Sequence, residues 1–154
     1  MTTMRGSNAR WTGLTLALML TAAPVAAQSS ADAEAEAVRA VVTRGYVEGI
    51  QKNMGRERIR EGLHPSFVMP VLTDDGVTST TIDEGASRLP PEGQAPTAEI
   101  THEIPTVSLA GDAAVAQVEL YRDGVHVFTD FINLYRFPEG WRMVAKTFHR
   151  HPTE

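Results

Sequence analysis

The last third of the chain alternates apolar and polar side chains and is divided by short turn sequences. Gly111-Asp112, Asp123-Gly124 and Pro138-Glu139-Gly140 separate four such segments between residues 98 and 152. Successive side chains of a strand point to opposite faces of a sheet, and Asp-Gly pairs favour the tight turns of β-hairpins. The pattern therefore predicts four antiparallel strands that pair in the order in which they follow one another.

The sequence ahead of these strands has helical periodicity. From residue 33 to about residue 52, apolar side chains recur every three or four residues and form one stripe, which includes Val42 and Tyr46. A second, short helix is expected over residues 56–63. It should end at His64-Pro65, because the residue before a proline avoids the α region.

Residues 66–82 indicate a β-hairpin that turns at Asp74-Asp75-Gly76. Pro70 restricts its first strand to a sheet edge or a bulge, since proline lacks the N–H that an inner strand donates. A helical turn at residues 83–89 and a Pro-rich loop at 90–97 follow. Helices first and strands last predict an α+β fold in which a curved antiparallel sheet wraps around the N-terminal helices.

The N-terminus has the three-part layout of a secretory signal peptide. A basic, acid-free start is followed by an apolar run, and Val25-Ala26-Ala27 supplies the small residues of a cleavage site. We expect residues 1–27 to be removed, which leaves a linker at 28–32 and one domain at 33–152. This predicts a periplasmic or secreted bacterial protein without stable membrane insertion, and the alternative is an uncleaved anchor.

Composition excludes several classes of function. The net charge of −5 and the pI near 5.5 argue against a nucleic-acid partner, whose phosphates require a basic surface. The chain has no Cys, which excludes disulfides, thiolate catalysis and Cys-ligated metals. It also lacks a dinucleotide fingerprint, a phosphate-binding loop and a metalloprotease motif, so no cofactor is expected.

Three segments resemble a known family: "GLHPSF" at 62–67, "GDAAVAQVEL" at 111–120 and "TDFINLYRFPEGWRMVAKTFH" at 129–149. They resemble the nuclear transport factor 2-like superfamily, and within it the putative lumazine-binding and SnoaL-like groups. The resemblance implies a cone-shaped, barrel-like α+β fold. This superfamily includes isomerases, dehydratases, binding proteins and proteins without activity, so the resemblance alone does not define a function.

Asp130 and Lys146 are the main candidate site residues. The resemblance places a carboxylate and a lysine at these positions, and a buried carboxylate can act as a general base. If Tyr135 faces Met143 in the closing hairpin, Asp130 lies opposite Phe148 and Lys146 is its diagonal neighbour on the same face. A register shifted by one residue would place them on opposite faces. The alternative role is an ion pair, which contributes about 0–1 kcal/mol if exposed.

Five further residues are candidates for ligand contact: Tyr46, His64, Phe131, Asn133 and Trp141. Tyr46 continues the apolar stripe of the first helix, where its hydroxyl could reach a pocket rim. His64 is a second candidate base, and its alternative role is at the helix–strand junction. Asn133 could bind a ligand or lie on the outer side of the sheet, and the two aromatic residues could line a pocket or fill the core.

The histidines do not predict a metal site. His149 and His151 are two residues apart on one strand face, but no third ligand follows at a recognisable spacing. His102 and His126 lie on other predicted strands and could complete a site only through the tertiary structure. No metal is therefore expected from the sequence.

These observations favour a secreted protein that binds a small apolar or aromatic ligand between the first helix and the sheet. Two alternatives remain open. One is a cofactor-free isomerase, dehydratase or cyclase with Asp130 or His64 as its base, and the other is a non-catalytic homodimeric interaction module.

Overall fold

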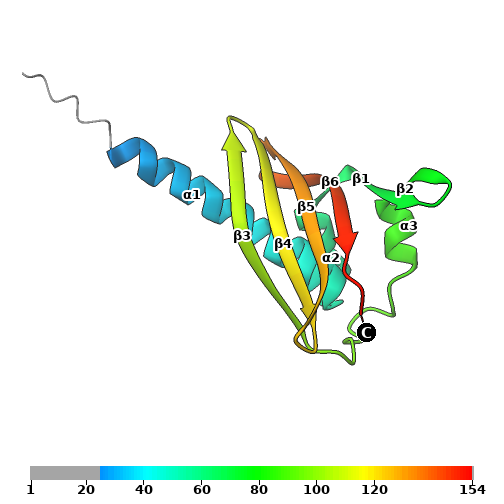
Figure 1. The fold of residues 1–154 in the computed structure, drawn as a ribbon. Helices are drawn as coiled ribbons and strands as arrows, with labels where there is room; N and C mark the ends of the chain where they lie inside the picture. The colour runs from blue at the N-terminus through cyan, green and yellow to red at the C-terminus, as the bar shows by residue number, and fades with distance from the viewer. Residues whose placement is uncertain (1–24, 154) are drawn as a thin grey trace, which may run out of the picture.

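The computed structural model describes residues 25–153, which form helices packed against one sheet (Figure 1). The helical elements are α1 (Val25–Val42), the π-helix η1 (Thr43–Gln51), α2 (Arg56–Gly62) and α3 (Ile82–Ser87). The strands are β1 (Leu63–Thr73), β2 (Gly76–Thr81), β3 (Ile100–Ala110), β4 (Ala113–Arg122), β5 (Val125–Phe137) and β6 (Gly140–Arg150).

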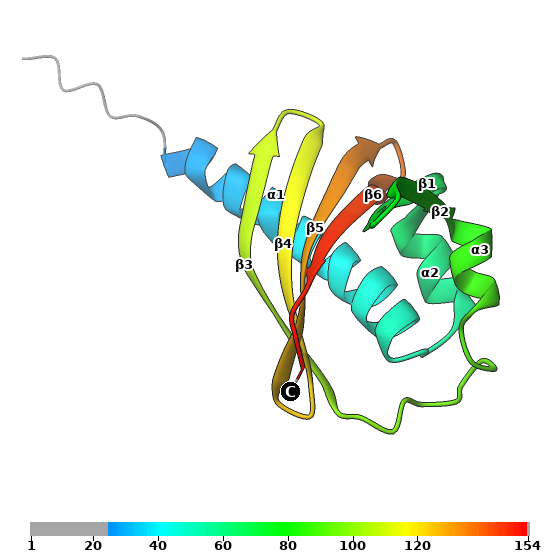
Figure 2. The ribbon, with the colours of Figure 1, turned by 45° about the vertical axis from the view of Figure 1, so that its right-hand side comes forward.

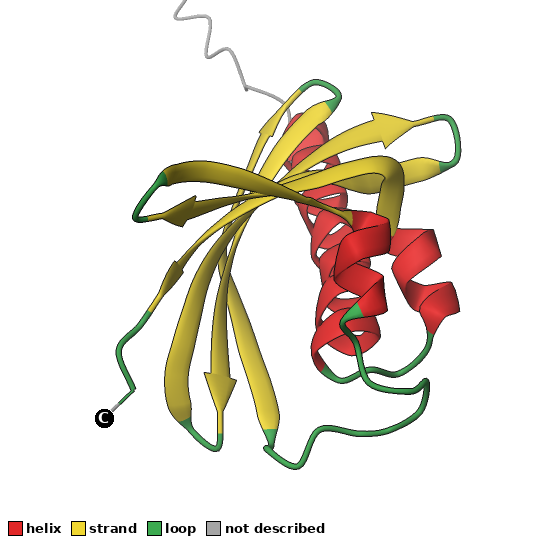
Figure 3. Ribbon diagram, turned by 90° about the vertical axis from the view of Figure 1, so that its right-hand side faces the viewer, coloured by secondary structure: helices red, strands yellow, loops and turns green. Residues whose placement is uncertain are grey.

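The strands form one curved sheet in the order β2-β1-β6-β5-β4-β3. All neighbours are antiparallel except β1 and β6, which are parallel. α1 crosses behind β3 and β4, and α2 and α3 lie beside the end of the sheet that holds β1 and β2 (Figure 2). The sheet bends over the helices, as its twist requires (Figure 3). The predicted α+β class and the helix-wrapping sheet are confirmed.

The predicted hairpins are confirmed, and β3 to β6 follow one another as expected. β1 lies inside the sheet order, yet its pairing with β6 extends only to Val68. At Pro70 the strand pairs with Ser79 of β2 alone. The proline thus occupies a local edge, where its missing N–H leaves no ladder bond unmade.

The first helix is longer than its apolar stripe predicted. α1 begins at Val25, so residues 28–32, expected as a linker, are helical. The predicted signal peptide lies almost entirely in residues 1–24, outside the described residues, and remains a prediction. Within residues 25–153, no helix is both long and apolar enough to cross a membrane.

The core lies between the helices and the inner face of the sheet. Every second side chain of β4 and β5 points inward, and Leu120, Ile132 and Leu134 are almost completely buried there. Val38 and Val42 of α1 complete this core with no exposed surface. Burying a side chain of this size contributes about 1.5–3 kcal/mol, so these residues fix the helix against the sheet.

The helices meet at an unusually close contact between two glycines. A Cβ built on Gly62 would lie 2.6 Å from the Cα of Gly45, and one built on Gly45 would lie 2.7 Å from both the Cα of Gly62 and the Cε of Met143. Backbone atoms cannot rotate away as a flexible side chain can. The contact of η1 with α2 therefore requires glycine at both positions.

We expect Gly62→Ala to lower the free energy of unfolding by about 1–3 kcal/mol or more, because the added methyl group overpacks a backbone contact. Gly85→Ala is the matched control, since the nearest atom to its added Cβ, Thr80 Cγ2, would lie 3.9 Å away. The control should be neutral or up to about 1 kcal/mol more stable, as alanine favours helix. Urea unfolding measures both changes, and equal stability of the two variants would contradict the prediction.

Candidate functional site

A buried polar network joins three elements that are far apart in the sequence. Lys146 of β6 donates a 2.6 Å hydrogen bond to Asp130 Oδ1 of β5, and Tyr46 of η1 donates a 2.7 Å hydrogen bond to Asp130 Oδ2. Lys146 also donates to the Tyr46 hydroxyl, at 3.1 Å. Asp130 is fully buried, and Lys146 and Tyr46 are 7% and 3% exposed. Both carboxylate oxygens are thus satisfied inside the fold, as a buried charge requires.

The register of the closing hairpin brings Asp130 and Lys146 together. Asp130 pairs with Phe148 and Ile132 pairs with Lys146, so the predicted diagonal neighbours do share the inner face. The premise of that prediction was wrong in detail, because Leu134, not Tyr135, pairs with Met143. An irregularity after Asn133 shifts the register by one residue, and a bulge of this kind has no clear signal in the sequence.

The π-helix positions the tyrosine and a second polar residue. Gln51 Nε2 donates a 2.9 Å hydrogen bond to the Tyr46 hydroxyl. Residues five apart point about 140° from each other in an α-helix, whereas i→i+5 bonding places them one turn apart. The backbone bond from Lys52 N to Val47 O is of this i→i+5 kind. The change of helix type at Thr43 thus directs both side chains to one place.

The network alters the proton affinities of its members. Burial, followed by the negative charge of Asp130, raises the pKa of Tyr46 well above its ordinary value of 10.0. The phenol therefore keeps its proton and remains a donor to Asp130. Burial lowers the pKa of Lys146, and the charge and hydrogen bond of Asp130 act in the opposite direction. The ring of Phe148, 4.6 Å from the ammonium, adds a cation–π contact.

A cavity of about 280 Å³ opens beside this network. η1 and α2 form one wall, β1, α3 and the end of β2 form a second, and the inner face of β4, β5 and β6 forms the third. Tyr46, Gln51 and Lys146 supply polar atoms, and most of the remaining lining is apolar. Its apolar side chains are Ile50, Ile59, Leu63, Phe67, Met69, Ile82, Ala86, Leu89, Phe128 and Phe148.

The charged residues on the cavity wall are all basic. Arg88, Arg122 and Arg150 line it together with Lys146, and among the described lining residues none is acidic. The three arginines are exposed, which places them where the cavity meets solvent. Within residues 25–153, neither Arg122 nor Arg150 forms an ion pair with a carboxylate. Arg150 instead lies over the ring of Phe128, 4.9 Å from its centroid.

The structure places the other predicted contact residues away from this cavity. Phe131 and Asn133 point to the outer face of the sheet, because they alternate with the inward-facing Asp130 and Ile132. Trp141 is buried and donates to Glu34 of α1 through its indole N–H. His64 stacks on Phe137, with ring centroids 4.6 Å apart, and its Nδ1 forms a hydrogen bond with the Ser66 hydroxyl. These four side chains do not line the cavity.

The three arginines are not among the residues predicted for the site, although the sequence carries a signal for one of them. Phe148 and Arg150 follow Lys146 at intervals of two residues, so all three must share the inner face of β6. Phe128 shares the inner face of β5 with Asp130 in the same way. Extending the two-residue period from Asp130 and Lys146 would have located both phenylalanines and Arg150, one of the three arginines.

The geometry does not place the two candidate bases against the cavity. Asp130 is fully buried, and its oxygens are held by Lys146 and Tyr46. His64 lies outside the cavity lining. A general base must come within hydrogen-bonding distance of the proton that it removes. Of the network, only Tyr46 and Lys146 reach the cavity wall.

The fold and the site define an α+β protein with a cavity between its helices and a curved sheet, the nuclear transport factor 2-like class. Residues 33–149 match the sequence model of the family described as "Putative lumazine-binding". This match covers most of the chain, and the protein therefore belongs to that family. None of the curated proteins matches the chain.

Solved structures agree with this class. A nuclear transport factor 2-like protein of unknown function from Shewanella baltica superposes with a TM-score of 0.64 at 22% identity, over 85% of this chain and all of that one. A similar protein from Silicibacter pomeroyi gives 0.61 at 20% identity, over 80% and 98% of the two chains. The S. rosetta CaMKII hub gives 0.52 at 15% identity, over 76% and 96%. At these identities the similarity shows the fold alone.

We expect Asp130→Asn to lower the free energy of unfolding by about 3–5 kcal/mol, because it leaves a buried ammonium without its counter-charge. Lys146→Met should lower the free energy of unfolding by a similar amount. The double variant should cost less than the sum of the two, with a coupling energy of about 1–3 kcal/mol. Urea unfolding at pH 7 of the four proteins measures this coupling.

The exposed pair of Arg44 and Glu61 provides the matched control, since its side chains are 52% and 43% exposed. The same cycle there should give less than about 1 kcal/mol, because water screens the pair. Equal coupling at the two sites would contradict the role assigned to the buried pair.

Proposed function

We propose that this protein binds a small, mostly apolar ligand with a negatively charged group in the cavity between η1 and the sheet. The composition of the cavity wall carries the proposal. Its interior is apolar and its edge bears arginines, and none of the described lining residues has a carboxylate. The protein as a whole is acidic, with a net charge of −5, so this local excess of basic residues is not a consequence of composition.

The aromatic and basic residues of the wall suggest how such a ligand would be oriented. Phe128 and Phe148 pack edge to face at 5.6 Å and present apolar surface to a flat ring. Arg122 and Arg150 carry guanidinium groups, whose planar donors match the two oxygens of a carboxylate, sulfonate or phosphate. The ring would occupy the interior, and the anion would remain at the solvent-exposed edge, where its desolvation costs least.

Two dyes with the same ring skeleton test this proposal. We expect 1-anilinonaphthalene-8-sulfonate to bind more tightly than N-phenyl-1-naphthylamine, which lacks the sulfonate. Arg122→Gln and Arg150→Gln should each weaken binding of the sulfonate about tenfold, equivalent to ~1.4 kcal/mol. Neither change should affect the neutral dye. Fluorescence titration measures all of these affinities.

Two control variants complete the design. Arg60→Gln removes an exposed charge from α2 outside the cavity lining and should leave both affinities unchanged. Ala86→Trp fills the cavity from α3 and should abolish binding of both dyes. Tight binding of either dye to Ala86→Trp, or equal affinities of the wild type for the two dyes, would contradict the proposal.

Lumazine is a further ligand to test, because the family description names it. Its flat pteridine ring suits a wall that contains Phe128 and Phe148. Gln51 and Lys146 each have one N–H beyond those that bind Tyr46 and Asp130, and these can donate to ring carbonyls and nitrogens. Its own fluorescence allows the same titration with the same variants.

We also propose that the protein acts outside the cytoplasm. The basic start, the apolar run and the small residues before Gln28 support export through a signal peptide. An exported binding protein without Cys would depend on its core for stability, and the buried residues of α1 and the sheet provide that core.

We propose, in addition, that the outer face of β4 and β5 mediates a homodimer. Val115, Phe131 and Tyr135 are 39%, 43% and 53% exposed there, although side chains of this kind are usually buried. Phe131→Glu should shift sedimentation from dimer to monomer. Val77→Glu alters an equally apolar but distant residue of β2, which is 70% exposed, and should have no effect. A monomeric wild type at all concentrations would contradict the proposal.

A further inference from the structure

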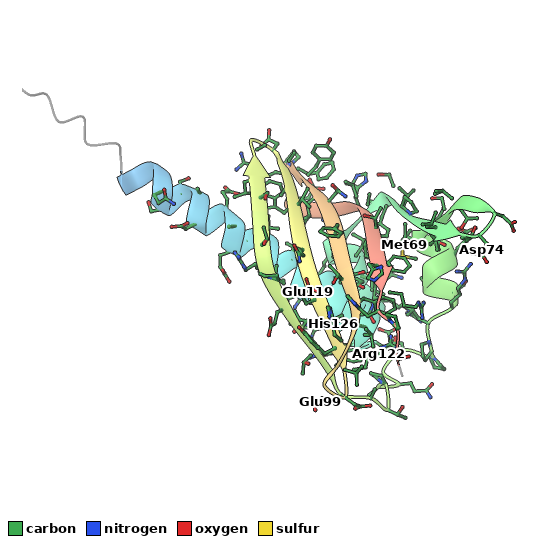
Figure 4. The ribbon with its side chains drawn as sticks, in the orientation of Figure 1. Met69, Asp74, Glu99, Glu119, Arg122 and His126 are labelled. Carbon is green, nitrogen blue, oxygen red and sulfur yellow. The ribbon has the colours of Figure 1, made fainter. Side chains whose placement is uncertain are left out.

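The tertiary structure brings two histidines and a glutamate together on the outer face of the sheet. Glu119 belongs to β4, His126 to β5, and His151 directly follows β6. One ligand atom from each lies within 4.8 Å of the other two, and all three residues are half-buried. Glu119 and His126 lie on the side of the sheet turned away from α1 (Figure 4). This cluster is therefore separate from the cavity, which faces the helices.

The three side chains converge on the hydroxyl of Thr129. His126 Nε2 lies 2.7 Å from Glu119 Oε2. Thr129 Oγ1 donates a 2.6 Å hydrogen bond to the same carboxylate oxygen and lies 3.0 Å from His151 Nε2. The imidazole rings of His126 and His151 are 3.8 Å apart. Ligand atoms from β4, from β5 and from the residue that follows β6 thus lie close together.

The backbone holds His151 in this position although it lies past the end of β6. Its N–H donates a 3.0 Å hydrogen bond to Val127 O, which continues the β5–β6 ladder by one step. Glu119 is also oriented from its other side, because Gln117 Nε2 donates to Glu119 Oε1. Hydrogen bonds from residues around a metal site fix the direction of its ligands and raise its affinity for the ion.

An ion pair alone does not account for the cluster. It explains why His126 contacts Glu119, but not why a second imidazole packs against the first. Two imidazolium rings at this distance would repel each other, whereas two neutral imidazoles and a carboxylate form a common donor set for Zn²⁺ and related ions.

We propose that Glu119, His126 and His151 bind a divalent transition metal ion, with Zn²⁺ as the best match. Nitrogen and oxygen ligands lie about 2.0–2.2 Å from Zn²⁺, which places them roughly 3.4 Å from one another in a tetrahedron. The present separations are within reach of that arrangement after small side-chain rotations. Three protein ligands leave a fourth position open to water or to another molecule.

Isothermal titration with Zn²⁺ of the full chain, prepared without an affinity tag and treated with EDTA, tests the site. The chain contains no Cys, so no thiolate competes for the ion. We expect saturable binding of one ion per chain. His126→Ala and His151→Ala should each weaken it at least about tenfold. His64→Ala, which removes a half-buried histidine of β1 outside this cluster, should bind as the wild type does.

A second readout separates loss of ligands from loss of the fold. Glu119→Gln retains the shape of the side chain but removes its charge, and it should also weaken binding while the melting temperature in EDTA stays close to that of the wild type. Cu²⁺ bound to the wild type should show two nitrogen ligands by electron paramagnetic resonance, and His151→Ala should show one. No saturable binding, or unchanged affinity in His126→Ala and His151→Ala, would overturn the proposal.

Discussion

The buried contact of Asp130 with Lys146 and Tyr46 fixes the relative positions of η1, β5 and β6. Removing a carboxylate and an ammonium from water costs several kcal/mol each, and only close pairing offsets this cost. An arrangement that separated these groups would leave a charge unpaired in the core. The network therefore favours one register of the closing hairpin and one rotation of the π-helix.

The cavity follows from the way in which the helices contact the sheet. Gly45 and Gly62 allow η1 and α2 to approach closely at one point. Farther along η1, the larger Ile50 and Gln51 line the cavity. Residues of α3, β5 and β6 line its other sides. The curved sheet lies against the helices where η1 and α2 are in close contact. At the far end of η1 the cavity separates the sheet from the helices. Lys146 lies at the boundary, bonded to the network on one side and exposed to the cavity on the other.

The two faces of the sheet carry different chemistry because successive side chains alternate between them. On β5, Phe128 and Asp130 point inward, whereas Thr129 and Phe131 point outward. The inner face presents basic and aromatic groups to the cavity, and the outer face presents the cluster of Glu119, His126 and His151. A ligand in the cavity and an ion on the outer face would be separated only by the thickness of the sheet.

Local periodicity and turn chemistry were sufficient to predict the α+β class and the order of the hairpins. They left the register of the closing hairpin open, and the folded sheet decided that Asp130 and Lys146 share its inner face. The tertiary structure alone decided the parallel pairing of β1 with β6, the bulge after Asn133 and the π-helix that aligns Tyr46 with Gln51. It also decided that Trp141 and His64 lie outside the cavity lining and that His126 meets His151. Such contacts join residues distant along the chain, and they depend on the curvature and packing of the whole sheet, which no short sequence pattern specifies.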